Sequence, residues 1–349
     1  MKSYGNVALI GSGETSASGG QTFEALAREL PAPLKAAVVE TPAGFEGNSV
    51  QVAGRVADFL SQRLQNYRPQ VKIIPARKRG TPYSPDQPDI VQSLYDRDLI
   101  FLGPGSPSYT VRQLTDSLAW QVIQARHRLG ASLALASAAS IAVGALSLPV
   151  YEIYKVGEDP HWKAGLDFFK PFGLSLVILP HWNNRDGGDE LDTSRCFMGQ
   201  GRFALLQAMV PVEYTLVGID EHTSLLISFE HETCKVTGQG AVHLLRAGEQ
   251  RDYAAGEQFP LQALGDYQPL PEPPSGLPGA VWEKAQALAQ SPLPSPAPVP
   301  EAVQQLASQR QEARKDKAWR RADELRQQIA SLGWNVQDTP SGPVLSEKE

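Results

Sequence analysis

The chain has 349 residues, of which 42% are hydrophobic and 20% are charged. Such a chain can build a full core, which excludes wholesale disorder. Its formal net charge of −6 excludes a nucleic-acid binder whose whole surface is basic, though not a local basic patch. The two cysteines, Cys196 and Cys234, are too few for a disulfide framework and lack metal-ligand spacing. The opening MKSYGNVALIGSG is typical of a first strand and not of a signal peptide, which predicts a cytoplasmic protein.

Up to about residue 150 the sequence repeats a pattern of strand, loop and helix. Strands are expected at Val7–Ile10, 36–39, 71–74, Leu99–Leu102 and Ser132–Ala136. Helices are expected at 22–30, 50–64, 89–95 and 109–128. Alternation of this size predicts a parallel sheet covered by helices on both faces, with functional loops at the carboxyl ends of the strands.

After residue 150 shorter strands dominate, and then the composition changes. Strands are expected at 150–154, 174–179, 214–219, 224–229, 234–237 and Ala241–Arg246, with a helix at 201–209. They complete an α/β domain over residues 1–260, a three-layer sandwich with a mostly parallel sheet. Residues 261–300 are rich in proline and are expected to form a linker that contains a short helix. Residues 301–349 are expected to form a small helical C-terminal module.

The segment 130–150 carries no charge and changes its period midway. Alternating residues up to Ala136 indicate a buried strand, and the small and apolar residues beyond it recur at helical spacing. Ser137 therefore lies where a strand turns into a helix, the place where serine hydrolases put their nucleophile. The alternative is that Ser137 only caps its helix. A membrane span is not expected, because glycine, proline and four serines interrupt the segment.

A serine nucleophile needs a base and an acid that orients the base. His181 follows the apolar strand LSLVILP, which places it at a strand end on the same side of the sheet as Ser137. The acid is either Asp220 or Glu221 in VGIDEHTSLL, again where an apolar strand ends. These residues form a plausible catalytic triad. The alternative is that His181 only forms hydrogen bonds with its loop.

The loop GPGSPS at 103–108 follows the fourth expected strand. Its prolines have no N–H, so Gly105 is the best donor in the loop. With the N–H of Ala138 it would form an oxyanion hole, although a plain tight turn has the same sequence pattern. The glycines near residue 11 miss the spacing of a dinucleotide loop, and 183–192 lacks the ligand pattern of a calcium loop. We therefore expect neither a cofactor nor a metal.

The first 250 or so residues resemble the dipeptidase E and cyanophycinase group of serine peptidases, which have a class I glutamine amidotransferase-like fold. The matching segments are FLGPGSPS at 101–108, LASAAS at 135–140, ILPHWNN at 178–184 and VGIDEHTSLL at 217–226. The resemblance implies that Ser137 is the nucleophile, His181 the base and Glu221 the acid. It also implies an aspartyl-type substrate, with Arg202 and Ser106 as candidate contacts to it.

The chain departs from the pattern of this group at the serine. Two glycines of the family motif are replaced by Leu135 and Ala139, and the loop at 103–108 differs from the family's G-G-D-Q-like loop. Alanine is the smallest replacement, whereas leucine is harder to accommodate in a crowded turn. These changes indicate a hydrolase with shifted specificity, or a former hydrolase.

The tail at 308–345 resembles the C-terminal end of cysteinyl-tRNA synthetase, with the spacing kept over about 40 residues. In that enzyme the module lies on the anticodon side of the tRNA, which implies RNA contact here. Four basic residues share one expected helix face and would follow phosphates, namely Arg310, Arg314, Lys317 and Arg321. The alternative is a solvated charged face that docks on the protein itself or on a partner. No catalytic synthetase motif is present.

Two hypotheses of different classes follow. The first is a serine hydrolase that cleaves a peptide or amide bond through Ser137, His181 and Glu221. The second is a non-catalytic scaffold whose C-terminal module binds tRNA or a translation partner. The partners expected are therefore a small peptide or amide substrate, tRNA through the tail and a second copy of the chain in a homodimer, with no membrane.

Overall fold

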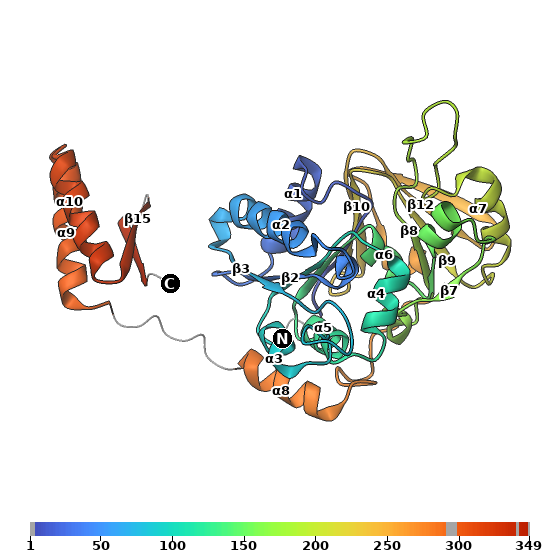
Figure 1. The fold of residues 1–349 in the computed structure, drawn as a ribbon, viewed down its shortest axis with the longest axis horizontal. Coiled ribbons are helices and arrows are strands. Elements are labelled where there is room, and N and C mark those ends of the chain that lie inside the picture. Colours follow the sequence, from blue (N-terminus) through green and yellow to red (C-terminus); the bar gives the residue numbers. More distant parts are fainter. Residues whose placement is uncertain (1–3, 291–298, 340–341, 348–349) are drawn as a thin grey trace. The chain divides into compact units, whose positions relative to one another are not determined.

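The computed structural model describes residues 4–290, 299–339 and 342–347. The chain divides into two compact units, Met1–Gln290 and Ser291–Glu349, and each is described by itself (Figure 1). The boundary between the two units lies within the segment 261–300 that was expected to be a linker. Leu261, Leu264 and Val281 are buried in the main core of the first unit, so most of the segment expected to be a linker folds with that unit.

The first unit contains an eight-stranded sheet with the strand order β14-β11-β10-β1-β5-β4-β2-β3. Five strands are parallel, as the repeating pattern predicts: β1 (Val7–Ile10), β2 (Lys35–Val39), β3 (Gln70–Ile74), β4 (Leu99–Leu102) and β5 (Ser132–Ala136). An antiparallel edge follows on the other side of β1, made by β10 (Thr223–Ser228), β11 (Thr233–Gly238) and β14 (Gln258–Pro260). The prediction of a mostly parallel sheet is thus confirmed for one half of this sheet.

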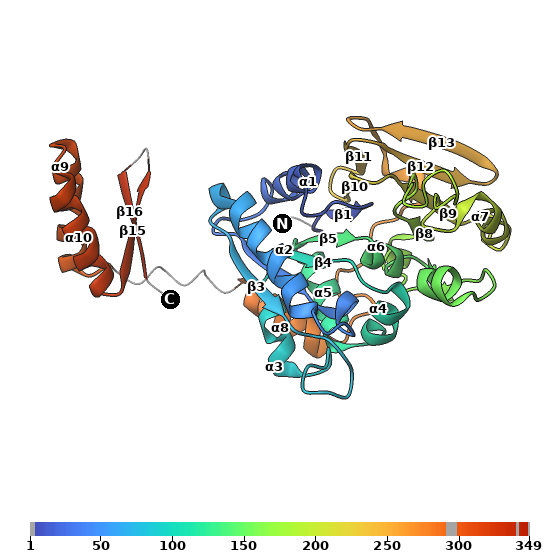
Figure 2. The same ribbon diagram turned by 45° about the horizontal axis from the view of Figure 1, so that its top comes forward.

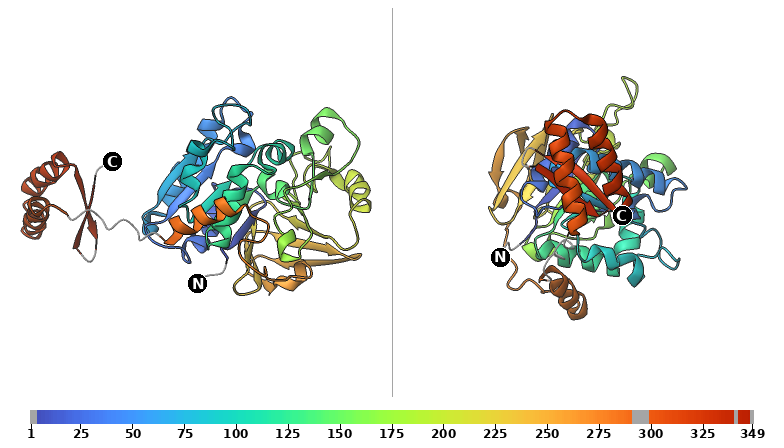
Figure 3. Two further views of the ribbon diagram at one scale, coloured as in Figure 1. Left: turned by 90° about the horizontal axis from the view of Figure 1, so that it is seen from below. Right: turned by 90° about the vertical axis from the view of Figure 1, so that its left-hand side faces the viewer.

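Both faces of this sheet are covered, because successive residues of each strand point to opposite sides. On one face, Ala8 and Ile10 pack with Phe23 and Leu60 from α1 (Ala17–Ala27) and α2 (Ser49–Arg63). On the other face the cover is α3 (Pro88–Val91), α5 (Leu118–Arg128) and α8 (Gly279–Gln290). Figure 3 shows α8 in orange against the rest of the unit, where it contacts α5. The result is the expected three-layer α/β/α arrangement.

A second sheet, which the sequence did not predict, joins the first unit. Its six strands have the order β13-β12-β9-β8-β6-β7. They are β6 (Leu146–Ser147), β7 (Lys163–Ala164), β8 (Leu176–Leu179), β9 (Thr215–Ile219), β12 (Ala241–Arg246) and β13 (Glu249–Ala254) (Figure 2). The chain passes from this sheet to the first one between β9 and β10, through residues 220–222. That crossing places two carboxylates at the junction of the sheets.

Several helices differ from the expected ones. The helix expected at 109–128 is two helices, α4 (Pro107–Leu114) and α5, because Ser117 caps a new helix start by accepting a hydrogen bond from the Trp120 N–H. The strand expected at 150–154 is a helical turn at Glu152–Val156. The remaining helices of the first unit are α6 (Ala138–Ala142) and α7 (Gly199–Ala208).

The second unit is a helical hairpin followed by a β-hairpin. The single helical stretch expected at 301–332 is divided into α9 (Glu301–Lys315) and α10 (Trp319–Ser331), with Lys317 in a left-handed conformation between them (φ 58°). The hairpin β15 (Trp334–Thr339) and β16 (Gly342–Glu347) was not predicted. A small apolar core joins these elements: Val303, Ala307, Ile329, Trp334 and Val336.

Among the helices of the described segments, none is both long and apolar enough to cross a membrane.

Candidate active site

Ser137 occupies a strained corner between β5 and α6. Its backbone angles are φ 51° and ψ −112°, and its N–H donates to the Ile10 carbonyl at 3.1 Å. The Ser140 hydroxyl secures the corner by donating to the Leu135 carbonyl at 2.6 Å. An L-residue is held in this region only where the surrounding structure imposes it, and such strain is typical of a nucleophile elbow. The hydroxyl does not cap α6.

The corner forms without the two glycines of the family pattern. Leu135 lies within β5, in register with Leu9 of β1 and Leu102 of β4, and its side chain is fully buried in the main core. Ala139 is fully buried in the same core. A side chain at position 135 therefore points into apolar packing and not into the turn, so this departure from the family is compatible with the corner.

His181 and Glu221 meet Ser137 at the junction of the two sheets. His181 follows β8 and Glu221 follows β9, which are parallel neighbours, so their carboxyl ends meet at the same edge. The Ser137 Oγ lies 3.0 Å from His181 Nε2, and His181 Nδ1 lies 2.9 Å from Glu221 Oε1. With the Nδ1 proton facing the carboxylate, Nε2 is free to accept the hydroxyl proton. Of the two acids that sequence reasoning left open, the structure brings Glu221 to His181.

Two asparagines, which the sequence analysis did not single out, hold Glu221. Asn184 is buried and donates from Nδ2 to Glu221 Oε1 at 2.9 Å, while Asn183 Oδ1 accepts from the Glu221 N–H at 2.9 Å. The hydrogen bond from His181 lowers the pKa of Glu221, and the bond from Asn184 adds to this effect. Glu221 therefore stays ionised at neutral pH. The signal in the sequence was the pair of amides that directly follows HW at 181–182.

The glycine-containing loop after β1 supports the acid. A Cβ at Gly11 would lie 2.1 Å from the Asp220 carbonyl oxygen, so the close passage of the 220–222 crossing requires glycine. Ser12 Oγ accepts a hydrogen bond from the His222 N–H at 3.0 Å. This loop thus fixes the backbone on both sides of Glu221.

The two expected oxyanion donors lie beside Ser137. Ala138 is the first residue of α6, where backbone N–H groups lack partners within the helix, and both Ala138 and Gly105 line the cavity at Ser137. Gly105 has φ 150°, and a Cβ there would lie 1.9 Å from the Pro42 carbonyl oxygen. Glycine is therefore required at position 105 by the approach of the 41–43 turn.

The cavity next to Ser137 has a volume of about 230 Å³. Its walls come from α6, from the helical turn after Val150 and from the turn that precedes α7. The Phe197 ring lies 5.6 Å from the His181 ring and 5.5 Å from the Tyr154 ring, measured between centroids. The remaining lining residues are Pro107, Ile141, Val150, Tyr151, Lys155, Asp186 and Cys196.

The turn that forms part of this cavity has an unusual backbone. Arg195, Cys196 and Phe197 all have positive φ (55°, 59° and 68°), a conformation that costs roughly 1–2 kcal/mol for each non-glycine residue. Two hydrogen bonds hold it against the histidine loop: Arg195 N–H donates to the Trp182 carbonyl at 2.8 Å, and Cys196 N–H to the His181 carbonyl at 3.2 Å. His181 itself has φ 53°. The left-handed turn 195–197 is therefore hydrogen-bonded to the loop that contains the candidate base, His181.

The two candidate substrate contacts lie elsewhere. Arg202 is an exposed residue of α7 and is not among the described residues that line the cavity at Ser137. Ser106 caps α4, where its hydroxyl accepts from the Tyr109 N–H at 3.2 Å, and it lines a neighbouring cavity of about 650 Å³. The structure thus brings together the expected nucleophile, base and acid, but not the two residues expected to recognise an acidic side chain.

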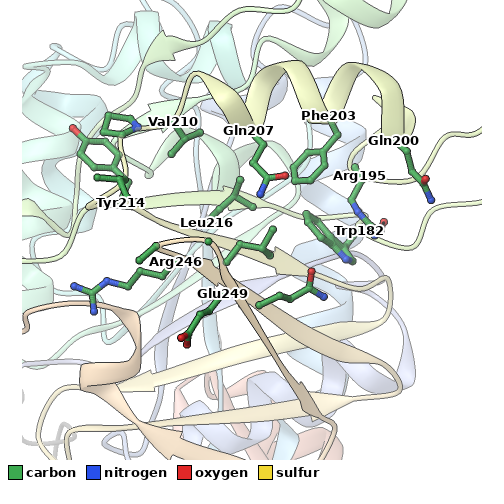
Figure 4. A pocket seen from close by; sticks show the side chains of 16 residues that line it. Trp182, Arg195, Gln200, Phe203, Gln207, Val210, Tyr214, Leu216, Arg246 and Glu249 are labelled. Atoms are coloured by element: carbon green, nitrogen blue, oxygen red, sulfur yellow. Dashed lines mark hydrogen bonds between the residues drawn. The ribbon is translucent and has the colours of Figure 1, made fainter.

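A second histidine cluster lies behind the first. The Nε2 atom of His243 lies 3.2 Å from Asp220 Oδ1, and its Nδ1 atom lies 2.9 Å from Asp252 Oδ1. Its ring stacks on Trp182 at 5.4 Å, and the Arg195 guanidinium covers the indole at 4.0 Å. Figure 4 shows Trp182 and Arg195 side by side in a cavity of about 480 Å³ beneath α7. Asp220, the alternative acid, is therefore engaged with His243.

The four basic residues that were expected to contact RNA differ in their exposure to solvent. Arg310 is buried, with an exposed fraction of 4%, so the expectation that it contacts a nucleic acid is wrong. It faces the core because α9 ends at Lys315 and folds back, which turns this side of the helix toward α10. Arg314, Lys317 and Arg321 are exposed around the turn between the helices. The Arg314 guanidinium lies 5.7 Å from the ring centroid of Trp319, and Arg321 pairs with Glu324 at 3.2 Å.

The fold of the first unit is similar to that of a solved protein structure. A crystal structure of a peptidase from an acI-B1 Actinobacterium matches with a TM-score of 0.59 and 22% sequence identity, over 74% of this chain and 97% of that chain. At this level of identity the likeness is one of fold, and it agrees with the α/β fold expected from the sequence.

The C-terminal part of the chain matches a different protein family. Residues 297–342 match the family described as cysteinyl-tRNA ligase anticodon binding domain. The cysteine–tRNA ligases of Chlamydia caviae and Methanosarcina mazei are each 47% identical, over 45 and 47 residues respectively. These matches span 13% and 14% of this chain and about a tenth of the length of each ligase. The resemblance of the tail is therefore confirmed for this short module.

Proposed function

We propose that the first unit is a serine hydrolase that cleaves a peptide or amide bond. The observation that supports it is the chain of contacts from Ser137 to His181 and on to Glu221, at 3.0 and 2.9 Å, with a strained backbone at the serine. A hydroxyl that only capped a helix would have neither the strain nor this alignment. The peptidase-like fold is consistent with the proposal.

In the proposed first half-reaction, Ser137 Oγ adds to the carbonyl carbon while His181 Nε2 takes the hydroxyl proton. Negative charge develops on the carbonyl oxygen, where the N–H groups of Ala138 and Gly105 would stabilise it. Glu221 stabilises the imidazolium that forms. The imidazolium then protonates the leaving nitrogen, the C–N bond breaks, and an acyl ester remains on Ser137.

In the second half-reaction a water molecule gives its proton to His181 and adds to the ester carbonyl. The tetrahedral intermediate collapses, the acid product leaves, and the proton returns to Ser137 Oγ. Each proton thus moves through His181 Nε2, and Glu221 needs no change of protonation, in agreement with the lowered pKa of its carboxyl.

The test of this proposal is covalent labelling of the full chain with a fluorophosphonate, followed by peptide mass mapping. We expect one adduct, on Ser137, and its loss in Ser137→Ala. Ser61→Ala serves as the control, because Ser61 lies on α2 and only donates to the Ala57 carbonyl. Equal labelling of Ser137→Ala and the original chain would show that the proposal is wrong.

We further propose that the second unit contacts tRNA. The match of residues 297–342 and the exposure of Arg314, Lys317 and Arg321 around one turn support this. Each lost phosphate contact should reduce the slope of log K against log salt concentration by about 0.7–0.9. In filter binding of tRNA by the full chain, the variant with alanine at positions 314, 317 and 321 should therefore show a slope that is smaller in magnitude by about 2. A charge-matched control replaces Arg28, Arg68 and Lys72 of the first unit. No retention at low salt would contradict the proposal.

A further inference from the structure

The cavity beside Ser137 differs in chemistry from the aspartyl-type site that the family resemblance implies. We infer that the residue whose carbonyl Ser137 attacks has an uncharged side chain, aromatic or branched aliphatic, and not an acidic one. This inference rests on the proposed hydrolase function and names its substrate class. It follows from what lines the cavity, from where the charges lie and from the size of the space.

The deep walls of the cavity are apolar. Ile141, Val150 and Cys196 have exposed fractions of 3%, 7% and 1%, and the rings of Tyr154 and Phe197 close one side. A carboxylate placed against these groups would lose its hydration without gaining a partner, which is unfavourable. An aromatic or aliphatic side chain would instead gain the favourable burial of apolar surface, and offset ring contacts in the aromatic case.

The charges of the cavity lie at its rim and oppose each other. Lys155 and Asp186 are both exposed, and one positive and one negative charge give no net preference for an anion. The Lys155 ammonium lies 4.7 Å from the centroid of the Tyr154 ring, directed onto the ring face. Within the described part of the chain, the arginine expected to bind an acid, Arg202, does not line this cavity, and Arg195 is stacked on Trp182.

The size and position of the cavity fit one side chain. Its volume of about 230 Å³ is below the ~300–1,000 Å³ typical of sites that enclose a drug-sized ligand. Ser137 and both candidate oxyanion donors line the same space, so a carbonyl bound there places its own side chain against the aromatic pair. The left-handed turn 195–197 holds Phe197 in place, which makes this wall a fixed part of the site.

The first arm of the test measures binding without chemistry. With the Ser137→Ala variant of the full chain, NMR titration would compare N-acetyl-phenylalanine amide, N-acetyl-leucine amide and N-acetyl-aspartate amide. We expect the phenylalanine and leucine ligands to bind at least about tenfold more tightly than the aspartate ligand. Equal or tighter binding of the aspartate ligand would overturn the inference.

The second arm measures turnover of the corresponding N-acetyl p-nitroanilides by the unmodified chain. Preferential cleavage of the phenylalanine or leucine compound supports the inference, and preferential cleavage of the aspartate compound overturns it while leaving the hydrolase proposal intact. Binding of phenylalanine amide without any turnover or fluorophosphonate labelling would contradict the hydrolase proposal and support the apolar character of the cavity.

A change of one wall residue provides a gain-of-function check. Tyr154→Arg places a cation in the cavity, so the ratio of aspartate to phenylalanine binding should rise by about tenfold or more. Val156→Arg is the matched control, because Val156 has an exposed fraction of 73%, lies two residues away and is not among the lining residues. It adds the same charge and should leave the ratio unchanged. An equal rise in both variants would show that net charge and not the cavity wall sets the preference.

Discussion

Two histidines at the junction of the sheets have opposite surroundings. His181 lies between a hydroxyl and a carboxylate, whereas His243 lies between two carboxylates, Asp220 and Asp252. The acids come from consecutive residues, because Asp220 serves His243 and Glu221 serves His181. The comparison shows that the partner on the second ring nitrogen decides the role: a hydroxyl leaves a nitrogen free to take a proton, while a second carboxylate favours the imidazolium.

The pKa of His243 reflects this surrounding. Burial alone lowers it, but the hydrogen bonds to Asp220 and Asp252 outweigh burial, so that the pKa is raised. His127 is a third case, because it is fully buried among aromatic rings and neither ring nitrogen has a hydrogen-bond partner within the described residues. The same side chain therefore serves as candidate base, carboxylate-paired residue and neutral core residue in one unit.

The largest expected effect is a difference in catalytic activity between variants of His181 and variants of His243. His181→Gln should lower kcat/KM on the preferred p-nitroanilide by at least about 10³-fold, since it removes the group that moves each proton. His243→Gln should leave kcat/KM within a few-fold, because its ring does not touch Ser137 or Glu221. Similar losses in both variants would mean that His181 has no special role.

The next difference concerns acid stability. Burial lowers the pKa of His127 to about 3, well below its usual 6.5, so the unfolded chain binds the proton first as the pH falls. Stability that is complete above pH 6.5 is thus lost toward pH 3, by about 3 kcal/mol at pH 4. His127→Phe should remove this loss, as measured by urea unfolding at pH 7 and pH 4. If the stability of the original chain and that of His127→Phe depended on pH in the same way, this account would be contradicted.

A smaller effect is expected from the amide that holds the acid. Asn184→Ala removes a hydrogen bond to Glu221, so the pKa of this carboxyl should rise, which NMR titration of the carboxyl would measure. We expect kcat/KM at neutral pH to fall by about tenfold. Asn184→Asp tests the sign, since a second negative charge beside Glu221 should raise the pKa of its carboxyl further. A fall in rate without a change in that pKa would indicate a purely structural role.

The smallest expected effect is on the stability contributed by His243. Its folded pKa is raised, so its contribution is complete below pH 6.5 and is lost as the pH rises through the folded value. His243→Gln should therefore cost about 1 kcal/mol at pH 6 and less at pH 9, the figure being modest because Asp252 is half exposed. Chemical unfolding at the two pH values measures this. A cost that grows with pH would contradict the raised pKa of His243.

Much of the candidate site was predictable from local patterns. The uncharged segment around Ser137 and the apolar strand before His181 place both residues at strand ends, and the structure confirms these placements. The choice between Asp220 and Glu221 was not predictable, because adjacent strand residues point to opposite faces and only the pairing of strands decides which face meets His181. The pair of amides after His181 and Trp182 was a local signal for polar support, but that Asn184 and Ser12 contact the 220–222 segment joins residues distant in sequence and could not be predicted.

The fold was predictable where the pattern is regular. The five parallel strands follow from alternating apolar segments, whereas the second sheet depends on where short strands find partners. Arg310 was misplaced because one continuous helix was expected where the chain folds back at Lys317. Leu261 and Val281 were assigned to a linker because proline-rich composition outweighed two scattered apolar positions, yet both are buried.

Because Asp220 and Glu221 are adjacent in the sequence, a shift of β9 by one residue would disrupt the candidate active site. β9 is paired with β8 and β12 in a fixed register, with Val217 opposite Ile178 and Leu244. Insertion or deletion of one residue in β9 would send Asp220 toward His181 and Glu221 toward His243, with side chains of the wrong length on both sides. The apolar residues of β9 would exchange faces at the same time. Natural length variation in this protein should therefore avoid β9 and accumulate in the exposed residues 188–191 of the loop after His181.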